Sequence, residues 1–166
     1  MKKLVLAAVL VAGIFPALTT PSHAEIDNPW EIHTDEENPF SEDSLKIYAG
    51  SIWIGGLRGV VLTCTEYREI TDFDIGESEE GEKVPVGIAV DGKVIATMDD
   101  AEVVRLTSGK IGLRAKITAD QRKAIGEALK TAKKAIHLKG AYDGGQKITA
   151  RGSTAAGQAL LSKCSK

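Results

Sequence analysis

The chain has 166 residues with a formal net charge of −2, and 43% of its residues are hydrophobic. This length and composition fit one globular domain with a modest core. Charge is shared unevenly, because residues 25–82 hold 16 acidic and 3 basic side chains, whereas residues 83–166 hold 16 basic and 7 acidic ones. The acidic half would repel phosphates and the basic half lacks clustered aromatic residues, which excludes nucleic acid as an expected partner.

This asymmetry has two interpretations. One is that the two halves fold over one another and partly neutralise their charges, which fits the small net charge and is the one we expect. The other is that the asymmetry marks an acidic or basic binding surface.

Residues 1–24 have the three-part pattern of a secretory signal peptide. Lys2 and Lys3 precede an apolar run of about 15 residues, and the segment ends in "PSHA". We therefore predict Sec-type export, with cleavage between Ala24 and Glu25, that makes the protein periplasmic or secreted. The run is shorter than the roughly 20 residues of a spanning helix, so a retained anchor is the weaker alternative and we expect no stable membrane anchor after cleavage.

Cys64 and Cys164 are the two cysteines of the sequence. An even count in an exported chain indicates a disulfide framework, and two cysteines allow one pairing. The alternative is two unrelated buried thiols. Cys164 lies near a chain end, where residues normally fray, so a bond to Cys64 would fasten the terminus to the core.

The acidic residues 25–44 are predicted to form an extended lead-in before a single globular domain at 45–166. The Asn-Pro pairs at 28–29 and 38–39 favour turns and discourage helix. Alternating apolar residues then predict strands at 45–54 and 60–67, with Cys64 on the apolar face.

Three hairpins are predicted further along the chain. Their turns are Asp91-Gly92, Ser108-Gly109 and residues 143–145, between strands at 84–90 and 93–98, 101–107 and 111–117, and 135–142 and 146–152. His137 alternates away from its apolar neighbours, so we expect it to face solvent.

Two helices are predicted from a change of period. The first begins at Thr118, which forms a capping-box pattern with Gln121, and Gly126 within it suggests a close approach to the sheet. The second is a short terminal helix with Ser153 as its N-cap and Cys164 on its apolar face. The predicted fold is α+β and mostly β: an antiparallel sheet or sandwich built from hairpins, with one amphipathic helix and a disulfide-pinned C-terminal helix.

Motifs for catalysis, metal binding and cofactor binding do not emerge from the sequence. The histidines lack metal-ligand spacing, "RGSTAAG" is not a G-x-S-x-G elbow, and the acidic stretch at 72–82 lacks the residue order of a calcium loop. We therefore expect a non-enzymatic protein without a cofactor, which binds a protein partner in the compartment to which it is exported. An alternative is an inhibitor that presents an acidic loop, Glu77, Glu79, Glu80 and Glu82, to a basic enzyme such as lysozyme. A hydrolase with an unrecognised site is a further alternative.

The order of "PWEIHTDEENPF", "GVVLTC", "GIAVDGKVIATMDDAEVVRL" and "LKTAKKAIHLKGAYDGGQKITARGSTAAGQALLSKC" resembles type VI secretion-associated periplasmic proteins. Residues 86–164 are also similar to the invasion-associated locus B family, although the chain lacks that family's further cysteine pair near "SGKIGLRA". The resemblance implies a non-enzymatic envelope protein associated with secretion or virulence. The positions that carry it are Trp30, Cys64, Gly152, Ala156, Leu160 and Cys164.

Overall fold

The computed structural model describes residues 25–26, 29–34, 44–53, 56–71, 79–105, 111–140 and 145–164. Within these residues, ten strands form one sheet in the order β1-β10-β9-β6-β7-β8-β5-β4-β3-β2. Only the β1–β10 pair is parallel among the described pairs. The strands are β1 (Glu25–Ile26), β2 (Glu31–Thr34), β3 (Leu45–Trp53), β4 (Gly56–Leu62), β5 (Glu66–Thr71), β6 (Lys83–Val90), β7 (Lys93–Arg105), β8 (Ile111–Lys116), β9 (Ala135–Lys139) and β10 (Gln146–Thr149).

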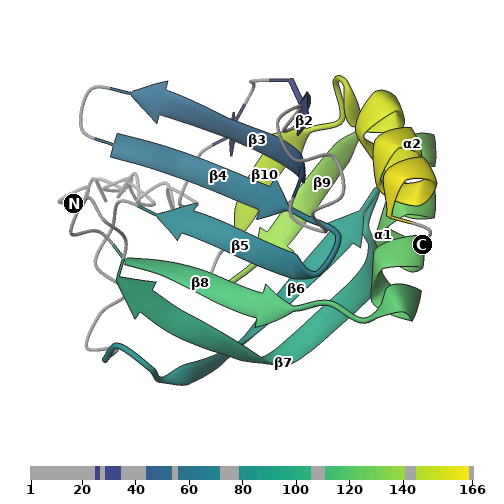
Figure 1. Ribbon diagram of the computed structural model, residues 1–166. Coiled ribbons are helices and arrows are strands. Elements are labelled where there is room, and N and C mark those ends of the chain that lie inside the picture. Colours follow the sequence, from purple (N-terminus) through teal and green to yellow (C-terminus); the bar gives the residue numbers. More distant parts are fainter. Residues whose placement is uncertain are drawn as a thin grey trace, which may run out of the picture.

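The sheet is strongly curled, and the two helices lie together at one end of it (Figure 1). Its two edge strands, β1 and β2, are consecutive in the chain and lie at opposite ends of the strand order. Since extended chain spans at most about 3.6 Å per residue, the link from Ile26 to Glu31 brings the two edges within about 18 Å. The N-terminal segment thus bridges both edges of the sheet.

The concave face of the sheet forms the core. Alternate residues of the strands point inward, and the largest fully buried side chains are Tyr67, Leu45, Ile47, Leu62, Leu113, Ile125, Leu129, Ile136, Leu138, Ile148 and Leu160. The predicted mostly-β fold with antiparallel pairing is confirmed, as a single curled sheet.

A bulge makes one long strand out of two predicted ones. β7 is continuous, whereas the alternation predicts separate strands at 93–98 and 101–107. Val84 pairs with Ala101 and Val86 with Met98, so Asp99 and Asp100 together oppose the single residue between Val84 and Val86. Both aspartates are exposed. The bulge shifts the alternation of apolar and polar residues at this point, and for that reason the sequence pattern predicts two strands where the structure has one.

The helices are α1 (Ala119–Thr131) and α2 (Ser153–Lys163). The capping box of Thr118 and Gln121 is present as predicted. Gly126, however, approaches α2 and not the sheet: a Cβ on Gly157 would lie 2.4 Å from the Gly126 carbonyl oxygen. Ser153 is not the N-cap either, because that position is held by Gly152 in a left-handed conformation.

The residues predicted as a lead-in take part in the sheet through β1 and β2. Between these strands, the Trp30 backbone N–H donates to the Arg151 carbonyl at 2.9 Å and its indole N–H donates to the Thr149 carbonyl at 3.0 Å. Gly152 packs against the Trp30 backbone, where a Cβ would lie 2.8 Å from the Trp30 oxygen. The predicted signal peptide, Ala24, and the turns at 108–109 and 143–144 lie outside the described residues.

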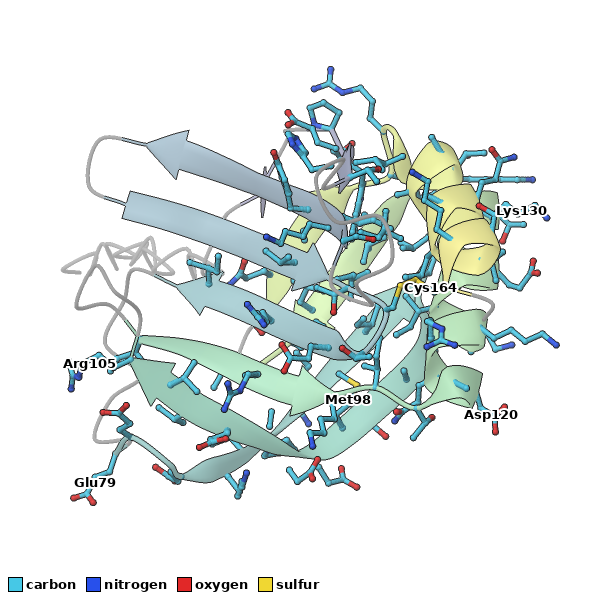
Figure 2. The ribbon with its side chains drawn as sticks, viewed as in Figure 1. Glu79, Met98, Arg105, Asp120, Lys130 and Cys164 are labelled. Atoms are coloured by element: carbon cyan, nitrogen blue, oxygen red, sulfur yellow. A yellow bond between two sulfur atoms is a disulfide. The ribbon has the colours of Figure 1, made fainter. Side chains whose placement is uncertain are left out.

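The Cys64–Cys164 disulfide is present, as the sequence predicted. Cys64 follows β4 and Cys164 caps α2, and both are buried. Figure 2 shows the sulfur–sulfur bond where Cys164 ends the terminal helix. Arg122 of α1 donates to the Cys64 carbonyl at 2.7 Å, so this corner joins the sheet to both helices. A disulfide of this kind fits an oxidising, extracytoplasmic compartment.

Candidate functional site: a buried carboxyl beneath an outer groove

A polar cluster lies on the concave face, inside the apolar core. Tyr67 and Glu69 alternate inward on β5, and Gln146 points inward at the start of β10. Glu69 is only 1% exposed, and it is the one buried carboxylate of the described residues. β5 and β10 are not neighbours in the sheet, so this cluster exists only because the sheet curls.

Both oxygens of the Glu69 carboxyl have partners. The Tyr67 hydroxyl donates to Oε2 at 2.9 Å, and the Gln146 amide donates from Nε2 to Oε1 at 2.8 Å. Burial raises the pKa of Glu69 to about 7, against the opposing effect of these two hydrogen bonds. The pKa of Tyr67 is raised as well, first by burial and then by the neighbouring carboxylate.

Gly140, which follows β9, gives this carboxyl its space. A Cβ on Gly140 would lie 2.0 Å from Glu69 Oε2, so no larger residue fits there with the carboxyl in place. The Gln146 Oε1 atom is buried and has no hydrogen-bond partner among the described residues. Glu69 therefore connects β5 to one end of the β9–β10 hairpin, where β9 ends and β10 begins, and its raised pKa allows its carboxyl to change protonation state near neutral pH.

Sequence reasoning misses Glu69, because it is one of the many carboxylates of residues 66–82. One weak signal is present. Tyr67 and Glu69 share a strand face opposite Arg68, whose side chain pairs with Glu66 at the surface. Only the pairing of distant strands reveals that this face is the inner one.

The outer side of the same hairpin borders a shallow groove of about 400 Å³ over β9, β6 and β7. Its centre runs along β6, where the small residues Gly87 and Ala89 lie between larger neighbours. Cross-strand partners place His137 and Val94 on either side of Ala89, and Lys139 and Thr97 on either side of Gly87. We call these six residues the outer groove. His137 is exposed, as predicted.

Val94 makes the outer groove unusually apolar for a surface. It is 65% exposed, and Ile32 is the other large hydrophobic residue that is exposed among those whose exposure the structure describes. Val94 also borders a second groove of about 580 Å³, between the β6–β7 hairpin and the Ala124–Ala128 side of α1. The two grooves therefore adjoin at Val94.

Asp91 holds this hairpin in place. It occupies a left-handed turn with Gly92, as the Asp-Gly signal predicted, and its φ is 51°. Its carboxylate accepts hydrogen bonds from the backbone N–H groups of Lys133, Lys134 and Ala135, which lower its pKa. The β6–β7 hairpin is thereby fixed to the link between α1 and β9.

The acidic loop proposed as a partner site lies elsewhere. Glu79 and Arg105 are at the end of the sheet away from the helices (Figure 2). Glu79, Glu80 and Glu82 are exposed, while Glu77 lies outside the described residues. Glu80 pairs with Arg105 at 3.7 Å, and the Glu82 carboxylate accepts from the Glu79 N–H at 3.2 Å.

A charged groove of about 490 Å³ lies on the outer face of β5, β8, β7 and β6. Three cationic and three anionic side chains line it, namely Lys83, Arg114, Lys116, Glu66, Asp100 and Glu102. Glu102 pairs with Arg114 at 3.2 Å and with Lys83 at 3.8 Å. Because its charges balance within the groove, it selects no sign of ligand charge.

Comparison of the chain with protein-family models, with curated proteins and with solved structures finds no match. Within the described residues, no group of three or more His, Cys, Asp or Glu side chains is placed to hold a metal ion. The same residues contain no helix with the length and apolar character needed to cross a membrane.

Proposed function

We propose that this chain is a non-catalytic binding or accessory protein of the bacterial envelope, which holds a protein partner on the outer groove. The observation that carries the proposal is an apolar, basic-rimmed depression around the exposed Val94. The predicted signal peptide, the disulfide and the family resemblance support the envelope as the compartment.

The fold does not require the small residue that creates the groove. Gly87 is not among the described glycines with a positive φ, and a Cβ there would meet its nearest neighbour, the Ala96 oxygen, at 3.4 Å. A glycine inside a strand weakens it and often marks a place where a ligand or another backbone approaches closely. Gly87 therefore supports a role of the groove in binding.

The chemistry of the rim points to an acidic partner segment that also carries apolar side chains. Lys139 and His137 lie along one side of the groove, and no acidic side chain is among its lining residues. The groove is built entirely from the basic half of the chain, residues 83–166. An acidic segment would be attracted to this rim, and apolar side chains would cover Val94.

Site-specific crosslinking tests the proposal. The mature, disulfide-bonded chain is prepared with a benzophenone amino acid in place of Val94 and exposed to a bacterial periplasmic extract, at low and at high salt. We expect a discrete crosslinked protein whose yield falls about tenfold with Lys139→Glu and also falls at high salt. Gly87→Leu, which fills the groove, should abolish it.

Lys116→Glu is the matched control, because it reverses an exposed charge on β8, outside the outer groove. It should leave the crosslink unchanged. A crosslink that survives Lys139→Glu and Gly87→Leu, or that is lost equally with Lys116→Glu, would contradict binding at the outer groove.

The hydrolase alternative has one observation in its favour, the carboxyl of Glu69 with its raised pKa. A general acid or base must reach the substrate, yet Glu69 is 1% exposed and both its oxygens are occupied by Tyr67 and Gln146. Binding without catalysis is therefore the function that we propose. Amide shift mapping of the bound partner separates this function from the inhibitor alternative.

A further inference from the structure

The β9–β10 hairpin is contacted on both of its faces. On the outside, Lys139 and Gly145 border the outer groove. On the inside, the residues next to them, Gly140 and Gln146, meet the Glu69 carboxyl. A change at Glu69 is therefore one residue away from the groove on both strands of the hairpin, at the end where β9 stops and β10 begins.

We propose that Glu69 is a proton-controlled latch that keeps the β9–β10 hairpin closed against β5 while its carboxyl is protonated, and that ionisation favours release of the hairpin end bordering the outer groove. As a means of regulating binding, the latch rests on the proposed function. The motion of the hairpin itself does not depend on the proposed function, because it is inferred from the contacts of the Glu69 cluster.

Among the residues whose side-chain burial the structure describes, no cation is buried beside Glu69. Its cross-strand partners are Val60 on β4 and Leu113 on β8, and Tyr67 is the other titratable group at the cluster. From β9, His137 and Lys139 project to the exposed outer face. No other charged side chain is buried among the residues whose burial the structure describes, and the two groups that donate to Glu69 there, the Tyr67 hydroxyl and the Gln146 amide, are uncharged.

Gln146 can pair with Glu69 in either protonation state. As placed, its amide N–H₂ donates to the carboxylate, and its Oε1 atom is left without a partner among the described residues. Half a turn of the amide presents that oxygen to the proton of a neutral carboxyl. The two states thus keep a similar number of hydrogen bonds, and they differ in the buried charge, which only opening to water relieves.

Proton linkage gives the size of the pH effect on hairpin opening. If Glu69 has its ordinary pKa in the opened hairpin and a pKa of about 7 in the closed one, the opening equilibrium rises by up to roughly tenfold per pH unit between pH 5 and pH 7. Above about pH 8 it levels off, because the carboxyl is then ionised in both states.

Hydrogen exchange of backbone amides in the mature, disulfide-bonded chain tests the latch without any partner. Exchange is measured at pH 5, 6, 7 and 8 and corrected for the intrinsic pH dependence of amide exchange. In the wild type we expect the opening of β9 and β10 to increase several-fold per unit up to pH 7, while β3 and β4 serve as internal references. Glu69→Gln should abolish this dependence, and Glu102→Gln, at a half-buried carboxylate on the outer face of β7, should retain it.

Corrected exchange of β9 and β10 that is flat with pH in the wild type would overturn the latch, as would an increase of equal size in β3 and β4. The internal reference keeps the test valid even if Glu69→Gln fails to fold. Failure of the latch leaves crosslinking at the outer groove untouched, and absence of a crosslink leaves the exchange result untouched, so the two proposals fail separately.

Discussion

Cys64 and Cys164 lie 5.3 Å apart at their Cα atoms although 100 residues separate them in the chain. The bond closes a loop that contains most of the sheet and both helices, and it joins the residue that caps α2 to a residue that follows β4. The terminal helix is thereby held against the rest of the fold, at the corner where Arg122 also binds.

Loss of the disulfide should lower stability strongly. A closed loop of this length is worth about 4–5 kcal/mol in the chain-entropy model, which is a large share of the roughly 5–15 kcal/mol typical of a domain. Urea unfolding of the Cys64→Ser/Cys164→Ser double variant should give a lower midpoint. A midpoint equal to that of the oxidised wild type would show that the linkage contributes nothing.

Stability should depend on pH through Glu69. Its folded-state pKa of about 7 lies above the ordinary 4.5, so the folded chain binds more protons than the unfolded chain between these values. The free energy of unfolding therefore falls as pH rises through this window, by up to roughly 3 kcal/mol, and levels off above it. We expect Glu69→Gln to resemble the wild type near pH 5 and to exceed it near pH 8, by chemical denaturation. A wild type that is steadily more stable from pH 5 to pH 8 would refute this.

Two glycines should differ in their response to substitution by alanine. At Gly157 a Cβ would lie 2.5 Å from the Lys130 backbone nitrogen, where α1 and α2 cross, so Gly157→Ala forces the helices apart and should cost about 1–3 kcal/mol. At Gly87 the same change meets ordinary contact distances and should be close to neutral. Melting temperatures of the two variants give the comparison, and equal losses would contradict the close helix contact.

Asp91→Ala should lower the melting temperature, because three backbone N–H groups lose their acceptor and the turn loses a residue suited to a positive φ. Asp91→Asn should lose less, since it keeps an acceptor oxygen and tolerates the same conformation. As the pKa of Asp91 is lowered in the fold, its contribution should be present above the ordinary pKa and fall as acid protonates it. Thermal melts of the wild type and both variants at pH 3 and pH 7 test this prediction. Equal melting temperatures of the three proteins at pH 7 would contradict it.

The mature protein should begin at Glu25. Export with cleavage after Ala24 leaves a chain of 142 residues, and β1 then starts at its first residue, in register with Lys147. Intact mass and N-terminal sequencing of the periplasmic fraction test this directly. Recovery of a full-length chain in the membrane fraction would favour a retained anchor instead.

Local signals in the sequence predicted local structure well. The Asp91-Gly92 turn, the Thr118–Gln121 capping box and the inward face of Cys64 all depend on residues within a few positions of one another. The disulfide was also predictable, because two cysteines leave a single pairing.

The candidate site depends on contacts between distant segments, and these were not predictable from the sequence. The burial of Glu69 requires β5 to face β10 across a curled sheet, a relationship that no spacing along the chain encodes. The expected approach of Gly126 to the sheet was wrong, since a glycine signals a close neighbour without identifying it. Similarly, Ser153 is a good N-cap residue by type, but the close packing of Trp30 on Gly152 moves the cap one position earlier.

The outer groove as the binding surface is the central claim, and amide shift mapping tests it most directly. The isotope-labelled mature chain is titrated with the purified protein identified by crosslinking. We predict that the largest shifts fall on β9, β6 and the first half of β7, including Val94, with residues 79–82 unaffected. Shifts concentrated at residues 79–82 would instead support the acidic-loop inhibitor and would contradict binding at the outer groove.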